Sequence, residues 1–448
     1  MTATIMEYNQ MNFRIIAEQI FLAGVDSVLP DKLITSVMCL KDGVLKISDM
    51  SFSANLIENI FVIGAGKASA LMGKEVEKIL GDNITDGHIV VKYGYTCNLN
   101  FIKVTEAGHP SPDSSGFKAT GEILKIAEAA SCNDLVICLL SGGGSALLTD
   151  VTVGCSVEDM IKVNDLLVSC GACISEINAV RKHLSAVKGG ELARVVFPAT
   201  LISLILSDVP GNQLDVIASG PTVPDPTTFH QALEVLSKYR LTTLVPKGIL
   251  VHLEEGDAGI RPETPKADDP VFEKTFNILV GTNRKALEAA SRRAMEFNIN
   301  AVIINDQLQG DVTSVAEYLV ATALIYQRKE SEIKPICLLF GGETTVKVNR
   351  PGTGGRNQHL ALLTALLLKD KPGITVLSAG SDGSDGTTKA AGAVVDSDTF
   401  SSALSAGINS VKYVEEFDSF HFFKKSGGHI ITGPTMTNVM DIILVIVE

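Results

Sequence analysis

The feature that most constrains the fold is a recurring pattern, in which a short apolar run ends in a polar, glycine-containing loop and is followed by helical periodicity. Each run has the length of a buried strand, and such strands are typical of parallel sheets covered by helices. Ligands of open parallel sheets bind beyond the carboxyl ends of the strands, so we expect functional residues in these loops. The clearest examples are "IFVIGAGKAS", "LVICLLSGGGSALL", "LISLILSDVPGN", "ICLLFGGET" and "ITVLSAGSDGSDG".

Composition narrows the class of protein and its partners. The 448 residues, of which 46% are hydrophobic, favour two or three globular domains. The formal net charge of -13 argues against nucleic acid or an anionic membrane as the main partner. The N-terminal segment resembles neither a secretory signal nor a membrane span, which predicts a cytoplasmic protein. Only Cys170 and Cys173 form a C-x-x-C pair, so we interpret the eight cysteines as buried free thiols.

A charged segment with three prolines interrupts the pattern at residues 257–275. It predicts a linker between an N-terminal domain of residues 1–256 and a C-terminal domain of residues 276–448. The strand "NILVGTN" is expected to open the second domain. The elements expected after it are a helix near 284–296, a strand at 301–306, a helix from about Thr313 and a strand at 336–342.

The first loop, "GAGKAS", has the sequence of an anion-binding turn between a strand and a helix. Gly64, Gly66 and Ser69 imitate the spacing of a dinucleotide fingerprint, which would serve hydride transfer. Lys67, however, stands inside the turn where a pyrophosphate would lie, and a lysine there suits a phosphoryl group. From this loop alone, both a dinucleotide and a transferred phosphate remain open.

The second loop, "SGGGS", offers consecutive backbone N–H groups between two hydroxyls. Three successive glycines exceed what a single tight turn requires, so we favour an anion-binding nest over a simple turn. The residues concerned are Ser141, Gly142, Gly143, Gly144 and Ser145.

Asp208 follows an apolar strand in "LSDVPGN", a position from which α/β enzymes commonly present a metal ligand or a base. An aspartate before proline and glycine can equally well cap a turn, and this segment alone does not decide between the two. Ser219, in the "IASGPT" stretch that follows, could supply a further hydrogen-bond donor. His109, in "EAGHPSP", is the one histidine that we expect near these loops.

The segment "PGTGGRNQHLALLTALLL" predicts a buried helix that begins after Gly355, with Arg356 and Asn357 in its first turn. A positive side chain at a helix N-terminus opposes the helix dipole unless an anion lies nearby. We therefore interpret Arg356 as an anion-binding residue rather than a surface arginine. Asp382 and Asp385, in "SDGSDG", lie either in a pair of turns or on a loop that contacts a Mg²⁺-nucleotide or substrate hydroxyls.

Together, these loops resemble the class II glycerate 2-kinases, whose C-terminal part carries the MOFRL name. The resemblance runs from about Phe13 to the C-terminus. Many members of that family have acidic residues at the positions of Asn212, His359 and Lys389. The motifs that carry the resemblance are "VIGAGKAS", "LLSGGGSALL", "INAVRKHLSAVKGGELA", "LSDVPGNQLDVIASGPTVPDPTTF", "PGTGGRNQ" and "AGSDGSDGTTKAAGAVVD".

The resemblance implies phosphorylation of the 2-hydroxyl of D-glycerate by ATP with Mg²⁺, giving 2-phosphoglycerate and ADP. It places the family's functional residues at Lys67, Asp208 and Arg356, with Asp208 as a candidate metal ligand. Some members have been named hydroxypyruvate reductases, so an NAD(P)H-dependent reductase is the alternative. Asp82 and Asp86, which we expect in a loop, do not complete a dinucleotide fingerprint, and this favours phosphate over hydride.

Pattern and resemblance together predict two α/β domains with the active site in the cleft between them. The N-terminal domain is expected to be Rossmann-like with a mainly parallel sheet, and the smaller C-terminal domain to have a mixed sheet. The expected partners are D-glycerate and ATP, with neither nucleic acid nor membrane, and the expected state is a monomer or homodimer.

Overall fold

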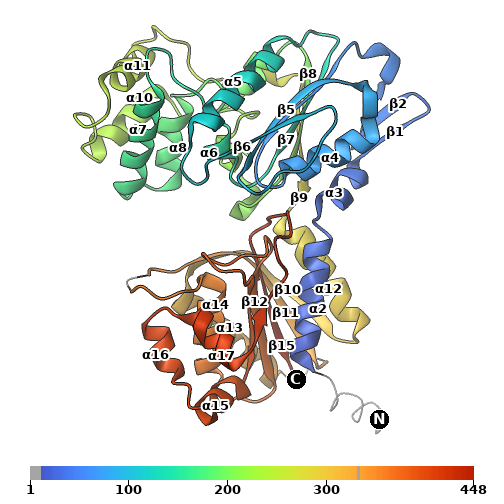
Figure 1. Cartoon of the computed structure of the whole chain (residues 1–448), viewed down its shortest axis with the longest axis vertical. Helices are drawn as coiled ribbons and strands as arrows, with labels where there is room; N and C mark the ends of the chain where they lie inside the picture. Colours follow the sequence, from blue (N-terminus) through green and yellow to red (C-terminus); the bar gives the residue numbers. More distant parts are fainter. Residues whose placement is uncertain (1–11, 330–332, 349) are drawn as a thin grey trace. The chain divides into compact units, whose positions relative to one another are not determined.

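A computed structural model describes residues 12–329, 333–348 and 350–448 (Figure 1). The chain forms two compact units. The N-terminal unit contains residues 30–207 and 212–280, and the C-terminal unit contains residues up to Leu29, 208–211 and 281–448. Each unit has a six-stranded sheet of its own.

The sheet of the N-terminal unit has the strand order β6-β5-β4-β7-β8-β9. The pairs from β6 to β8 are all parallel. The chain starts at the central strand β4, moves outward through β5 and β6, and then returns to the other side of β4. This reversal makes the β4–β7 boundary a topological switch point, where open parallel sheets bind their ligands. The strands are β4 Ile60–Ala65, β5 Ile84–Lys92, β6 Lys103–Ala107, β7 Leu135–Leu140, β8 Thr200–Leu206 and β9 Thr275–Gly281.

Helices α4 (Ser69–Leu80) and α5 (Ser114–Glu128) lie on opposite sides of this sheet (Figure 1), as right-handed crossovers in opposite directions require. A separate group of helices packs around its own apolar cluster: α7 Val157–Ser169, α8 Ile174–Lys182, α10 Phe229–Lys238 and α11 Lys247–Asp257. The smaller elements of the unit are α3 Pro30–Val37, α6 Gly144–Leu147, α9 Glu191–Val196 and an antiparallel sheet of β1 Met38–Lys41, β2 Val44–Ile47 and β3 Met50–Ser53.

The sheet of the C-terminal unit is mixed, with the order β10-β11-β15-β12-β13-β14. Only the β10–β11 pair is parallel among the neighbouring pairs of these described strands. All seven residues of β15 are buried, because it lies in the middle of the sheet with helices on both faces. The strands are β10 Asn300–Asp311, β11 Ile336–Thr345, β12 Ile374–Gly380, β13 Gly392–Asp396, β14 His429–Ile430 and β15 Asp441–Val447.

Two layers of helices cover this mixed sheet (Figure 1). Helices α2 (Phe13–Asp26) and α12 (Asn283–Glu296) pack together on one face. Helices α13 (Val312–Arg328) and α14 (Arg356–Leu367) pack on the other face, where they form an apolar core with the buried side chains of the strands. Three short helices complete that layer: α15 Asp398–Ser405, α16 Ser410–Glu415 and α17 Ser419–Ser426.

The predicted fold class is confirmed, since a Rossmann-like parallel sheet and a second, mixed sheet are both present. The compact units nevertheless differ from the predicted division, since residues up to Leu29 and 208–211 group with the C-terminal unit and residues 257–280 with the N-terminal unit. Helix α2 groups with the C-terminal unit, because Gly24 lets it approach α12 until a Cβ there would lie 3.1 Å from the carbonyl of Ala286. Residues 257–275, which we expected to form a linker, belong to the N-terminal unit, where Asp225 N–H donates to the Pro265 carbonyl at 3.0 Å.

Three smaller expectations were wrong. The strand "NILVGTN" is β9 and lies at the edge of the first sheet rather than opening the second. Asp86 lies within β5 and not in a loop, although β5 still ends in Lys92 rather than an acidic residue. The cysteines are free, but among the eight only Cys138 and Cys337 are buried. In the described part of the chain, no helix has both the length and the apolarity needed to cross a membrane.

Candidate active site

The two glycine loops predicted as anion-binding turns meet at the switch point of the first sheet. Gly66 has φ +139°, and a Cβ there would lie 2.2 Å from Ser141 Oγ, so only glycine fits. Lys67 N–H donates to the Gly142 carbonyl at 2.9 Å. Ser141 Oγ accepts from Ala68 N–H and lies 3.0 Å from the hydroxyl of Ser69. The buried serines thus join the two loops to each other.

Ser219 links this junction to two further segments. Its Oγ lies 3.1 Å from Ser145 Oγ and 3.1 Å from Asn178 Oδ1. Ser219 is fully buried and has φ +61°, an uncommon conformation for a serine. The predicted site residues of this unit are therefore brought together, and they are joined by Asn178, on α8, which was not foreseen.

His109 lies directly against the second loop. A Cβ at Gly143, which has φ +86°, would come within 2.9 Å of the imidazole Nε2. Burial, and then the charges of Lys67 and Lys92, lower the pKa of His109 to about 4, so the imidazole is neutral at neutral pH. Lys92 ends β5 and was not predicted, although its position at the carboxyl end of a parallel strand was a signal for it.

This junction suits a small anion. Two lysines and the backbone of a glycine-rich loop lie at the carboxyl ends of β4, β5 and β7, in a chain that is acidic as a whole. A phosphate or a carboxylate at this position would meet positive charge together with backbone and hydroxyl donors.

Arg356, in the C-terminal unit, has a carboxylate partner within the protein. Its Nε and Nη2 donate to the two oxygens of Asp441 at 2.6 and 3.0 Å, and its Nη1 lies 2.9 Å from Glu343 Oε1. Burial alone would lower its pKa, but Asp441 and then Glu343 outweigh that effect and raise it. The anion that the helix dipole argument required is therefore supplied by these two carboxylates, neither of which we predicted.

The N-terminus of α14 is capped by Asp385, which was predicted as a ligand-binding residue. Its oxygens accept from the N–H groups of Asn357 at 3.1 Å and Gln358 at 2.9 Å. A Cβ at Gly355 would lie 2.2 Å from Asp385 Oδ1, which explains the glycine. Burial raises the pKa of Asp385 to about 6, while the bonds from Gln358 and Asn357 act to lower it. Asp385 thus holds the helix that carries Arg356.

The remaining predicted residues take supporting positions. Asn357 donates to Asp441 at 2.8 Å and accepts from Ser378 at 2.6 Å, which fixes the carboxylate that binds Arg356. Asp382 accepts a hydrogen bond from Ser384 N–H at 3.0 Å. This bond is the one expected for the first turn, if the segment forms a pair of turns. Gly383 and Gly386 have φ +83° and +61°, consistent with such a pair of turns.

Asp208 lies just beyond β8 and groups with the C-terminal unit. It is partly exposed, and its Oδ2 lies 3.4 Å from Asn438 Nδ2. Within residues 12–329, 333–348 and 350–448, no cluster of three or more His, Cys, Asp or Glu residues could hold a metal ion by itself.

A cavity of about 400 Å³ lies beside Arg356 in the C-terminal unit. Its wall is formed by the end of β11, the glycine loop before α14, and the first turn of α14. The residues that line it include Glu343, Thr344, Val346, Val348, Gly354, Gly355, Arg356, His359, Asp385 and Phe417.

Comparison with known proteins identifies the family. Residues 16–254 match a domain of unknown function (DUF4147), and residues 336–441 match the MOFRL family. The chain is 38% identical to the glycerate 2-kinase of Pyrococcus horikoshii over 99% of its own length and 98% of that protein. The chain belongs to the glycerate 2-kinase family.

Relatives in this glycerate 2-kinase family support the fold and show how its names vary. The crystal structure of the Thermotoga maritima glycerate kinase superimposes with a TM-score of 0.86 at 36% identity, covering 97% of this chain and 99% of that one. A protein of Agrobacterium vitis that is 40% identical over 85% of each chain is named a putative hydroxypyruvate reductase. Lys67 and Ser141 fall within the first matched domain of the family, and Arg356 and Asp441 within the second.

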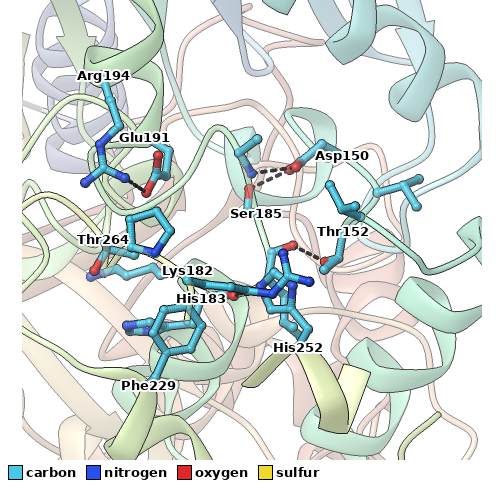
Figure 2. A pocket seen from close by; sticks show the side chains of 16 residues that line it. Asp150, Thr152, Lys182, His183, Ser185, Glu191, Arg194, Phe229, His252 and Thr264 are labelled. Atoms are coloured by element: carbon cyan, nitrogen blue, oxygen red, sulfur yellow. Dashed lines mark hydrogen bonds and ion pairs between the residues drawn. The ribbon is translucent and has the colours of Figure 1, made fainter. Parts of the chain in front are cut away.

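A second cavity, of about 200 Å³, lies in the N-terminal unit and is lined by residues of the "RKHLSAVKGGELA" motif (Figure 2). Several of its polar side chains are paired with one another, whereas Nδ1 of the lining residue His252 is buried without a hydrogen-bond partner. Asp150 accepts from Ser185 Oγ at 2.5 Å, and Arg194 lies 2.6 Å from Glu191. Burial raises the pKa of Glu191 to about 7, although Arg194 acts to lower it. Ser185 and Glu191 of this motif therefore each have a partner within the protein.

Proposed function

We propose that this protein transfers the γ-phosphate of ATP to the 2-hydroxyl of D-glycerate, giving 2-phosphoglycerate and ADP. The observation that carries the proposal is the junction at the switch point, where a lysine-bearing turn meets a glycine nest. Full-length similarity to glycerate 2-kinases supports the same reaction. A cytoplasmic location, where ATP is available, fits this role and remains a prediction.

Lys67 and the "SGGGS" loop have the anion-binding role in this proposal. Phosphoryl transfer depends on alignment and on neutralising charge more than on covalent chemistry. The ammonium group of Lys67 would stabilise the phosphoryl group in transit, and the loop backbone would hold an anionic group. Neutral His109 lies against this loop and could accept a hydrogen bond without adding charge.

In this proposal, Arg356 binds an anionic group of a substrate, and Asp208 acts on the substrate hydroxyl or on Mg²⁺. The guanidinium of Arg356, fixed by Asp441, would bind a phosphate or carboxylate oxygen, and Asp208 would orient the substrate hydroxyl. Mg²⁺ typically binds proteins through one or two carboxylates together with substrate phosphates, and the partly exposed carboxylate of Asp208 fits such a ligand. When bound, the ion would neutralise phosphate charge.

One experiment tests the proposal against the reductase alternative that the Agrobacterium vitis name raises. The purified protein is incubated with D-glycerate, ATP and Mg²⁺, and separately with hydroxypyruvate and NADPH. Phosphorus NMR should show 2-phosphoglycerate as the initial product of the first reaction, with no oxidation of NADPH in the second. An initial product of 3-phosphoglycerate would refute the assigned hydroxyl. NADPH oxidation without a phosphate ester would refute the kinase.

A further inference from the structure

A strained backbone segment lies beside the second glycine loop. Ala218, Ser219 and Gly220 are three successive residues in the left-handed region, with φ of +51°, +61° and +63°. Only glycine adopts this conformation without steric cost, so the alanine and the serine are both strained. All three residues are buried. Backbone strain of this kind persists only where the surrounding structure holds it, and it is concentrated at functional sites.

The strained segment contacts the "SGGGS" loop through two side chains. A Cβ at Gly144 would lie 2.8 Å from the Ala218 Cβ, so the loop backbone packs closely against this methyl group. Ser219 Oγ lies 3.1 Å from both Ser145 Oγ and Asn178 Oδ1. An amide oxygen only accepts and a hydroxyl has a single proton, so Ser219 donates to Asn178 and accepts from Ser145. The Ser145 proton is therefore committed to holding the loop.

Two glycines of the "RKHLSAVKGGELA" motif hold the strained segment in its conformation. Gly189 N–H donates to the Ser219 carbonyl at 3.0 Å, and Gly190 N–H donates to the next carbonyl, that of Gly220, at 2.8 Å. Both glycines of the motif are themselves left-handed, with φ of +59° and +85°, which disfavours any other residue at these positions. The motif therefore fixes the backbone that carries the Ser219 hydroxyl.

Lys188 connects the same motif to the residue that follows the glycine loop and its short helix α6. Lys188 is 4% exposed, and its Nζ donates to the Leu148 carbonyl at 2.5 Å. Burial lowers the pKa of Lys188 to about 8 against the opposing effect of Asp150, so the group is mostly protonated at neutral pH. The motif thus supports the loop at Leu148 directly and at Ser145 through the strained segment.

We propose that Ser219 is a positioning residue of the phosphoryl-transfer site, and that the "RKHLSAVKGGELA" motif serves catalysis by holding it in its strained conformation. The Ser219 hydroxyl fixes Ser145, and so keeps the backbone N–H groups of the "SGGGS" loop aligned with the anion at the junction. The inference rests on the proposed function for the identity of that anion. All the residues that carry it belong to the N-terminal unit.

Two substitutions at Ser219 separate alignment of the loop from stability. Ser219→Ala removes the hydroxyl but keeps the strain, whereas Ser219→Gly removes both. Arg240→Gly is the matched control, because Arg240 has φ +56° at an exposed position after α10 in the same unit. Each variant is measured by thermal unfolding, by an ADP-coupled assay with D-glycerate, and by phosphorus NMR titration with inorganic phosphate. Phosphate binding that Lys67→Ala abolishes is assigned to the junction.

We expect Ser219→Ala and Ser219→Gly to lower kcat by the same factor, about tenfold, as the loss of one buried hydrogen bond predicts. Their Kd for phosphate at the junction should rise about tenfold. The Tm of Ser219→Gly should exceed that of Ser219→Ala by about 2–4 °C, because one left-handed strain is relieved. Arg240→Gly should raise Tm by a similar amount with unchanged kcat and Kd. A purely structural role predicts unchanged kcat and Kd in every folded variant.

The outcomes separate this inference from the proposed function. Unchanged kcat and phosphate Kd in both Ser219 variants would overturn the positioning role while leaving the kinase intact. Weaker phosphate binding in these variants of a protein that forms no phosphoglycerate would instead refute glycerate as acceptor and leave the positioning role standing. Wild-type protein without phosphate binding that depends on Lys67 would overturn the inference. If Ser219→Ala fails to fold, Ser219→Gly, which carries no strain at this position, decides.

Discussion

Replacing Asp441 by asparagine should disable Arg356 without altering Arg356 itself. The Asp441 carboxylate is 1% exposed and binds Arg356 through two hydrogen bonds of 2.6 and 3.0 Å. An asparagine keeps the shape but loses the charge, and its amide donors would face the donors of Arg356 and Asn357. The guanidinium would then be held chiefly by Glu343, and we expect its position to change.

The size of the effect follows from the burial of the pair. Removing one partner of a fully buried ion pair costs about 3–5 kcal/mol. The Arg356 side chain is 32% exposed, so solvent screening reduces this to about 2 kcal/mol of unfolding free energy. Loss of one aligned charge at the reacting centre lowers kcat by about 100-fold. We therefore expect a modest fall in Tm and a large fall in kcat.

A matched ion pair in the same unit separates stability from catalysis. Arg14 Nε binds Asp396 Oδ2 at 2.5 Å on β13, with side-chain exposures of 31% and 25%. Asp396→Asn should lower Tm without changing kcat. Both variants are measured by thermal unfolding and by an ADP-coupled assay with D-glycerate. If Asp441→Asn retains the turnover of Asp396→Asn, then Asp441 does not position a catalytic arginine and this reasoning is wrong.

Three further predictions concern single residues. Lys67→Ala should lower kcat by roughly 100-fold in the same assay, whereas the exposed Lys74→Ala on α4 should not change it. Arg356→Lys should be nearly as impaired as Arg356→Ala, because lysine cannot bind both oxygens of a carboxylate. The pKa of Glu191 is about 7 when folded against 4.5 ordinarily, so the folded state binds more protons between these values and stability falls as pH rises through them. Chemical unfolding at pH 5 and 7 should show a smaller fall for Glu191→Gln, by up to roughly 2 kcal/mol.

Much of the fold could be predicted from the sequence because its strands are buried on both faces. Continuous apolar runs identified β4, β7, β8, β11 and β12 without any alternating pattern. The errors arose where contacts between residues far apart in the sequence decide which sheet a strand joins or which helix another helix packs against. The strand "NILVGTN" looks the same whether it opens a new sheet or extends an old one. Likewise, the apolar face of α2 gives no indication that its partner is α12, more than 250 residues later in the chain.

The candidate site likewise has features that could be predicted from the sequence and features that could not. Glycine loops are visible in sequence because backbone approach at Gly66 and Gly355 excludes every other residue. The partner of Arg356 was not visible, because Asp441 is the first residue of an apolar strand that pairs between β11 and β12. The helix dipole argument correctly required an anion near Arg356 but could not distinguish a ligand from a carboxylate of the protein.

The strand order of the N-terminal unit, with its reversal beside β4, is the order of dinucleotide-binding folds, so topology alone cannot separate hydride from phosphate transfer. The residues at the switch point favour phosphate transfer. A dinucleotide turn leaves its backbone N–H groups for the pyrophosphate, whereas here Lys67 N–H bonds the Gly142 carbonyl and Ala68 N–H bonds Ser141. The strand that should end in an acidic residue to bind a ribose ends in Lys92. Lys92 thus places a positive charge where a dinucleotide-binding fold has the carboxylate that binds the ribose. A positive charge at this position is expected in a protein that transfers phosphate.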